Sequence, residues 1–215
     1  DRLIQEIVLR RFKASAFIFK SKPQGKEKMT TSPIDFKLGD ILVTSKGAKQ
    51  IPVTNQNGQA LIWMHNESLS PCYNPSAFND PDATRVNLCL QMTDSLAEQL
   101  KSLDRSLITA IAADSKKYFG QTLSVDEVKN RMQPSVKVSD KGFDHWRLKM
   151  NLSGRGKVQC YGMDKNVRAL PDNWLAVSAC PRVQIKSIWI MSKEIGVIYE
   201  VVACQIDESV QECPF

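Results

Sequence analysis

The chain has 215 residues, 42% of them hydrophobic, and a formal net charge of +6 with an isoelectric point near 9.0. It is long enough for a sizeable core. It contains neither an apolar run of about eighteen residues nor a signal-peptide pattern, which argues against a membrane-spanning or secreted protein. The six cysteines have no paired short spacing, so we expect reduced thiols in an intracellular protein.

The positive charge is concentrated at the front of the chain. Residues 1–28 carry eight Lys or Arg and three acids, whereas residues 207–215 carry three acids and no base. We therefore expect a basic N-terminal extension (1–28), a folded domain (29–206) and a short acidic C-terminal tail (207–215). This distribution favours a polyanionic partner, although a charge of this size also serves solubility alone.

The N-terminal extension mixes local patterns. Residues 3–13 have the spacing of a short helix, whereas Phe17-Ile18-Phe19 favours a strand. The lysines of residues 20–28 surround a proline and a glycine, which predicts a mobile loop or arm. These lysines suit phosphate contacts, although solvated lysines need no partner.

Residues 36–92 predict strands separated by turns and one long loop. Strand-like runs occur at residues 41–43, 50–53, 60–64 and 85–92. Asn57-Gly58 predicts a tight hairpin with positive φ at both turn positions. The proline-rich loop 65–82 is expected either to be held against the body of the protein or to be used for binding.

The hydrophobic period changes to that of a helix at residue 94. Residues 94–119 predict a helix that buries a stripe of leucines and isoleucines in the core, with Ser95 and Glu98 as a capping box. The stripe lacks the sustained heptads of a partner zipper. A second, shorter helix is expected between Ser124 and Pro134.

Residues 144–153 show the cleanest alternation in the chain, which predicts a half-buried strand. Every second residue from Trp146 to Leu152 is apolar, and the residues between them present polar and cationic groups on the exposed face. Arg155 and Lys157 extend this positive strip into a turn, and residues 158–163 pair back with Tyr161 exposed. The exposed face predicts phosphate binding, although solvated sheet faces also carry Lys and Arg. The candidate contacts on the strand itself are His145, Arg147 and Lys149.

The run 181–206 predicts a C-terminal β-hairpin, because two β-branched and aromatic segments flank a Lys-Glu turn. Its first segment alternates Arg182, Gln184 and Lys186 with residues suited to the core, so we expect Arg182 and Lys186 to contact phosphates. The apolar run Ile188-Trp189-Ile190 indicates either a strand covered on both faces or a bulge.

The sequence contains no arrangement typical of an enzyme or a metal site. Its two histidines, His65 and His145, lie in no zinc-binding pattern, and no Walker or dinucleotide glycine pattern occurs. A nucleophilic site built from Cys72, His145 and a distant acid has no local support. We therefore predict a non-catalytic protein with no catalytic residues, no metal and no cofactor.

The order of these elements, several strands, a helical insertion, a basic strand and a C-terminal hairpin, resembles a known family. It is similar to the OB-fold single-stranded-DNA-binding proteins of bacteriophages and of large eukaryotic DNA viruses. The matching segments are patterns of residue class and order, and they span most of residues 48–206. They are residues 50–53 with 61–63, 104–120, 124–129, 146–149, and 187–189 with 195–197.

This resemblance implies an α+β, mainly β fold. The expected form is an open OB-fold-like five-stranded barrel with extra strands and a helical insertion between barrel strands. It also implies a groove in which cations bind phosphates and aromatic rings stack on bases. Of the rings that suit stacking, Tyr161 is preferred because it lies beside the basic strip. The others are Tyr73, Trp174 and Tyr199.

The implied function is single-stranded DNA binding in the replication, recombination or repair of a viral genome, in the host cytoplasm or nucleus or in virions. The implied partners are single-stranded DNA, with RNA as the alternative, a second copy of the chain, and replication proteins that dock on the acidic tail; no membrane partner is expected. The alternative function is a β-rich virion or scaffold protein that contacts the genome through its basic arm.

Overall fold

The computed structural model describes residues 34–45, 47–64, 66–77, 80, 83–140, 142–191 and 193–208. The predicted basic extension lies outside these residues, as does the predicted acidic tail beyond Glu208. The division at residues 28 and 206 therefore stays a prediction. Among the described residues, no helix combines the length and the apolar composition that a membrane span requires.

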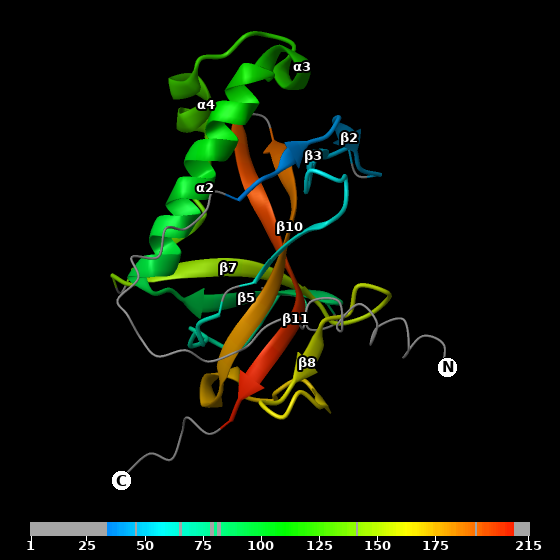
Figure 1. Ribbon diagram of the computed structural model, residues 1–215, viewed down its shortest axis with the longest axis vertical. Helices are drawn as coiled ribbons and strands as arrows, with labels where there is room; N and C mark the ends of the chain where they lie inside the picture. Colours follow the sequence, from blue (N-terminus) through cyan, green and yellow to red (C-terminus); the bar gives the residue numbers. More distant parts are fainter. Residues whose placement is uncertain are drawn as a thin grey trace, which may run out of the picture. The chain divides into compact units, whose positions relative to one another are not determined.

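The described residues form mostly strands, interrupted by one helical segment (Figure 1). In chain order the strands are β1 (Lys37–Leu38), β2 (Leu42–Val43), β3 (Lys49–Thr54), β4 (Leu61–Met64), β5 (Arg85–Gln91), β6 (Val136–Val138), β7 (Asp144–Asn151), β8 (Gln159–Tyr161), β9 (Val167–Arg168), β10 (Ser178–Met191) and β11 (Glu194–Asp207). The helices are α2 (Asp94–Ala113), α3 (Ser115–Phe119) and α4 (Val125–Arg131), and Trp174–Ala176 form a 3₁₀ turn.

The hairpin of β10 and β11 is the central element of the sheet. Its register runs from Ser178–Asp207 to Met191–Glu194, which confirms the predicted C-terminal hairpin. β10 pairs with β3 and β4 along its other edge, while β11 has β7 and β8 as parallel neighbours. β7 pairs in turn with β5 and β6. In Figure 1, β5 and β7 cross the long hairpin steeply.

A bulge in β10 changes which residues face outward. The register with β11 skips Lys186, which is therefore the extra residue. Before the bulge the even-numbered residues of β10 face outward. Beyond the bulge the odd-numbered residues Trp189 and Met191 face outward, whereas Ile188 and Ile190 are buried. Of the two explanations for the apolar run 188–190, the bulge is the correct one.

Helix α2 buries the predicted apolar stripe, and its start differs from the prediction. Thr93 is the N-cap, because its hydroxyl accepts a hydrogen bond from Leu96 N at 3.3 Å. The predicted capping box of Ser95 and Glu98 is therefore wrong. Ser124 forms the predicted capping box of α4 with Glu127. The buried stripe of α2 contains Leu96, Leu100, Leu103, Leu107, Ile108 and Ile111.

The core lies between α2 and the inner face of the sheet. Trp146 of β7 is fully buried there. Its ring centroid lies 5.3 Å from that of Trp63 and 5.2 Å from that of Tyr199, in tilted and edge-to-face contacts. These rings join β4, β7 and β11 in one apolar layer.

The predicted tight turn at Asn57-Gly58 is present, closed by hydrogen bonds from Gly58 N to Asn55 O and from Asn55 N to Gln59 O, whereas the strand pairings around it and after β7 differ from the prediction. The turn at Asn57-Gly58 joins β3 and β4 through a single bridge, Thr54–Ala60, because the two strands pair with different stretches of β10. Of the two turn residues only Gly58 has a positive φ, +75°. Strand β8 pairs in parallel with β11 instead of returning along β7.

The described part of the proline-rich loop 65–82 is held against the sheet. Isolated bridges join Leu69 to Ala179 and Ser76 to Asn87. Backbone hydrogen bonds of about 2.9 Å accompany both contacts. The first of the two alternatives for this loop is therefore confirmed.

The predicted α+β, mainly β class is confirmed. The described strands form an open, mixed sheet whose main order is β1-β3-β10-β11-β7-β5. The helices α2, α3 and α4 lie together in the chain between β5 and β6. The five-stranded OB-fold-like barrel stays a prediction.

Candidate nucleic-acid interface

Five cationic side chains share one face of the sheet, which we call the basic face. Lys149 of β7 pairs with Asn87 on β5 and with Glu200 on β11, and Glu200 pairs with Gln184 on β10. Directly opposed residues point to the same side of a sheet, so alternate residues of these four strands form one continuous face. The cations of the basic face are Arg85, Arg147, Lys149, Arg182 and Lys186.

One acid at the centre of the basic face binds two of these cations. Lys186 Nζ donates to Glu200 Oε2 at 2.7 Å, and Arg85 Nη2 donates to the same oxygen at 3.0 Å. The Glu200 side chain is 8% exposed, whereas those of Lys186 and Arg85 are 44% and 42% exposed. Lys186 is therefore an ion-pair partner as well as a candidate phosphate contact. Sequence reasoning missed Arg85, although it opens the alternation of β5.

Arg147 and Lys149 are the cations of β7. Lys149 Nζ donates to Asn87 Oδ1 at 2.7 Å, and burial, followed by the charges of Arg85 and Arg147, lowers the pKa of this lysine. Arg147 is exposed. Burial raises the pKa of the Cys89 thiol, against the nearby Arg147 guanidinium, which lowers it. An anion between Arg147 and Lys149 would offset their repulsion, so the pair suits a phosphate.

A groove opens where β7 separates from β11. The two strands pair over only two residues of each, around Lys149, and toward its start β7 pairs with β6 while β11 stays with β10. At the far end Gln133 N donates to Ile195 O at 2.7 Å, which brings the chain segments together again. The pocket between them has a volume of about 500 Å³.

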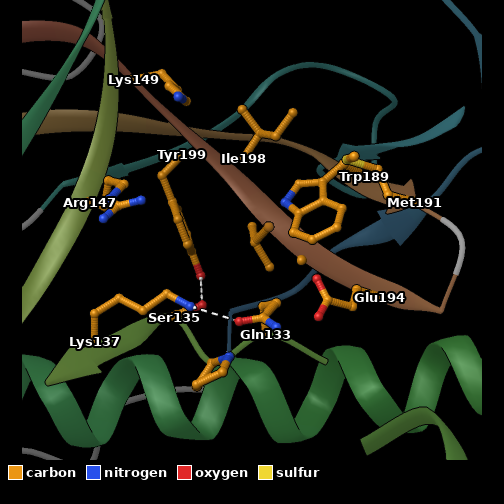
Figure 2. Close-up of a pocket in the computed structure, with 13 residues that line it drawn as sticks. Gln133, Ser135, Lys137, Arg147, Lys149, Trp189, Met191, Glu194, Ile198 and Tyr199 are labelled. Carbon is orange, nitrogen blue, oxygen red and sulfur yellow. Dashed lines mark hydrogen bonds between the residues drawn. The ribbon is translucent and has the colours of Figure 1, made fainter. Parts of the chain in front are cut away.

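The two sides of the groove differ in chemistry (Figure 2). The side formed by β6 and β7, which we call the cationic wall, carries Lys137, Arg147 and Lys149. The side formed by the hairpin tip, which we call the hairpin wall, carries Trp189, Met191 and Glu194. A nucleic-acid single strand has the matching pair of surfaces, an anionic backbone and flat apolar bases.

The ring of Trp189 lies over Gly196, its partner on β11. A Cβ built on Gly196 would be 2.6 Å from Trp189 Cζ2 and 2.7 Å from Cε2, so no other residue leaves room for the ring. Sequence reasoning did not select Trp189 among the candidate rings for stacking. The sequence signal for an outward Trp189 is that the alternation of polar and apolar residues changes after Lys186, where the register with β11 shifts.

A buried hydrogen-bond network forms the floor of the groove. Ser135 donates to Asp104 twice, from Oγ to Oδ1 at 2.6 Å and from N to Oδ2 at 2.8 Å. Ser135 Oγ also lies 2.7 Å from Tyr199 Oη, a contact drawn in Figure 2. Burial raises the pKa of Asp104, against the hydrogen bonds from Ser135. The network ties α2 to β11 beneath the groove. Its sequence signal is one acid within the apolar stripe of α2.

The remaining predicted contacts occupy different environments. His145 is only 6% exposed, and its pKa is lowered by burial and then by Arg147 and Lys137, so the prediction of an exposed histidine is wrong. The physical reason is that β5 and β6 flank it on both sides. Arg155 and Lys157 are exposed in the turn that follows β7.

The candidate stacking rings divide by exposure. Trp174 and Tyr199 are each 3% exposed, so neither can stack on a base without rearrangement. Tyr161 is half-buried on β8, and its hydroxyl donates to Gln159 Oε1 at 2.7 Å. Tyr73 is 49% exposed. It lies close enough to Arg147 for that charge to affect its pKa, which burial raises.

No protein-family model matches the chain, and no curated protein matches it either. Among solved structures, the chain is similar to the single-stranded DNA-binding protein from bacteriophage Enc34, whose structure is a complex with single-stranded DNA. The two share 10% sequence identity with a TM-score of 0.36, and the match covers 81% of this chain and 94% of that chain.

Proposed function

We propose that the protein binds single-stranded DNA in the groove and along the basic face, and that it catalyses no reaction. The observation that carries this proposal is the placement of a cationic wall opposite an aromatic ring across one groove. Phosphates would lie along Lys137, Arg147 and Lys149, and a base would stack on Trp189. Stacking of this kind contributes about 1–3 kcal/mol per base and tolerates any sequence.

The basic face extends this path beyond the groove. Arg85 and Lys186 share Glu200, so a phosphate arriving there meets two cations and one acid. Arg182 lies further along β10, on the side of the sheet where Tyr161 is half-buried on β8. Tyr161 and Tyr73 are additional rings for bases beyond the groove.

The detailed fold, the biological role and the protein partners in this proposal rest on the resemblance of residues 48–206 to the family of single-stranded-DNA-binding proteins. They comprise an OB-fold-like barrel and a role in replication, recombination or repair of a viral genome, in the host cytoplasm or nucleus or in virions. They also comprise self-association and docking of replication proteins on the tail 207–215. RNA is the alternative nucleic acid.

Titration of fluorescently labelled oligo-dT at several salt concentrations tests the proposal. Each neutralised phosphate contributes about 0.7 to the slope of log affinity against log salt, so the three cations of the cationic wall alone predict a slope of about −2, and contacts along the basic face make it steeper. Competition with oligo-U and with duplex DNA measures the preference for single-stranded DNA. A flat salt dependence, or tighter binding of duplex, contradicts the proposal.

The virion or scaffold alternative predicts a different result. It requires large assemblies in light scattering and loss of nucleic-acid binding when residues 1–28 are removed. The proposed groove predicts that the chain without these residues keeps a salt-dependent affinity for oligo-dT, because every residue of the cationic wall lies within residues 137–149.

A further inference from the structure

The hairpin wall contains an acid, which is unusual in a groove that binds phosphates. Glu194 of β11 lies two residues before Gly196 and opposite Met191, so it shares the outward face with the Trp189 ring. Figure 2 shows the carboxylate beside this ring, on the side of the groove away from Arg147 and Lys149. Glu194 lies near enough to Lys137 for its charge to act on the pKa of that lysine. A phosphate beside Glu194 would be repelled, so a base edge that donates hydrogen bonds suits this carboxylate better.

Two further groups define what a base on Trp189 would meet. Gln133 Oε1 accepts a hydrogen bond from Lys137 Nζ at 3.2 Å, which leaves the N–H donors of this amide for a ligand. Glu194 is exposed and lines the same pocket as Gln133. A base edge in this pocket therefore faces a carboxylate that accepts and, next to it, an amide that donates.

The four bases differ in how they fit this pair. Guanine presents two adjacent donors, the ring N1–H and the exocyclic N2–H₂, which match the two oxygens of one carboxylate, and its O6 accepts beside them. Thymine presents one N–H between two carbonyl oxygens, so its flanking acceptors oppose the carboxylate. Cytosine and adenine each present an amino group next to a ring nitrogen that only accepts.

We propose that the pocket formed by Trp189, Glu194 and Gln133 is a subsite for guanine within the single strand. The guanine ring stacks on Trp189, its N1–H and N2–H₂ donate to Glu194, and its O6 accepts from Gln133. This inference rests on the proposed function and adds a base preference to it. Only one position of the bound strand is affected, so other positions remain tolerant of sequence.

Three oligonucleotides of about 16 nucleotides test the subsite: repeating d(GT), repeating d(IT), and oligo-dT. Deoxyinosine differs from deoxyguanosine only by lacking the 2-amino group of the base, so d(GT) and d(IT) form a matched pair. Fluorescence anisotropy with the full chain is expected to give about fivefold tighter binding of d(GT) than of d(IT), the size of one net hydrogen bond. In the Glu194→Gln variant this ratio is expected to fall to about one, because an amide cannot accept two donors in this way.

The ratio of d(GT) to d(IT) affinity is the readout, because removing an acid also strengthens binding of every polyanion. Glu98→Gln on α2 is the matched control and is expected to keep the wild-type ratio. Equal affinities for d(GT) and d(IT) in the wild type overturn the guanine subsite while leaving the proposed function intact. Failure of all three oligonucleotides to bind overturns both.

Discussion

Trp189 and Gly196 are partners across the β10–β11 hairpin, and the indole occupies the space in which a side chain at position 196 would stand. The closest approach of a Cβ there would be 2.6 Å, to Trp189 Cζ2, which is below any real Cβ contact. The missing side chain lets the ring lie against β11 and line the groove. The availability of a ring for stacking therefore depends on a glycine in the neighbouring strand.

The Gly196→Ala substitution is expected to displace the Trp189 ring and to weaken oligo-dT binding by about fivefold or more, since one stacked base contributes about 1–3 kcal/mol. Anisotropy titration at fixed salt measures the change. Gly39→Ala is the matched control, because a Cβ there would meet only Pro52, at 3.4–3.5 Å. Tryptophan fluorescence checks that the Gly196→Ala variant is folded. If the folded variant binds oligo-dT with unchanged affinity, Trp189 does not stack on a base.

Charge reversal on the cationic wall is expected to weaken binding of all sequences alike. Arg147→Glu places an acid beside Lys149, which should lower oligo-dT affinity by about tenfold or more and reduce the salt slope by about 0.7. Lys116→Glu on α3 changes the charge by the same amount at a residue that does not line the groove. If both variants lose affinity equally, net charge and not the groove determines binding.

The parts of the fold that follow from local periodicity could be predicted from the sequence. The alternation from Trp146 to Leu152 identified β7 and the outward direction of Arg147 and Lys149, because side chains of a strand alternate whatever its neighbours are. The spacing of the leucines identified the buried face of α2 for the same reason. Ser124 and Glu127 lie within one helical turn, so their capping box was also predictable.

The parts that depend on the exact register of a hairpin or on pairing between distant segments could not be predicted. Lys186 and Glu200 form an ion pair because β10 and β11 pair with a bulge. The sequence of either strand alone does not indicate this ion pair. The groove exists because β7 leaves β11 after a short parallel contact. His145 has the same alternation as Arg147, yet it lies between β5 and β6 and its ring packs 6.2 Å from that of Phe143. A periodic pattern gives the direction of a side chain and leaves its exposure undetermined.

Removal of the acid at the centre of the basic face is expected to strengthen binding. In Glu200→Gln, Lys186 and Arg85 lose the carboxylate that they share, so both cations become available to phosphates and the salt slope should steepen by about 0.7 for each added contact. The thermal unfolding temperature of the same variant is measured in parallel and is expected to fall, because the two ion pairs are lost. The control Glu98→Gln removes an acid whose only described ion pair is with Lys101 on α2. Weaker binding of Glu200→Gln would mean that Glu200 positions the two cations for phosphate.

The buried His145 is expected to make stability fall in mildly acidic solution. Burial, then the charges of Arg147 and Lys137, lowers its pKa in the folded protein from the ordinary value of 6.5. The unfolded chain therefore takes up the proton first, so the stabilisation is fully present above pH 6.5 and is lost as the pH falls toward the folded-state pKa.

Urea unfolding of the wild type and of His145→Gln at about pH 7.5, 6.5 and 5.5 measures this effect. The free energy of unfolding should fall more steeply in the wild type, and His65 is present in both proteins and cancels. Parallel pH profiles would show that His145 titrates in the folded protein as it does in the unfolded chain.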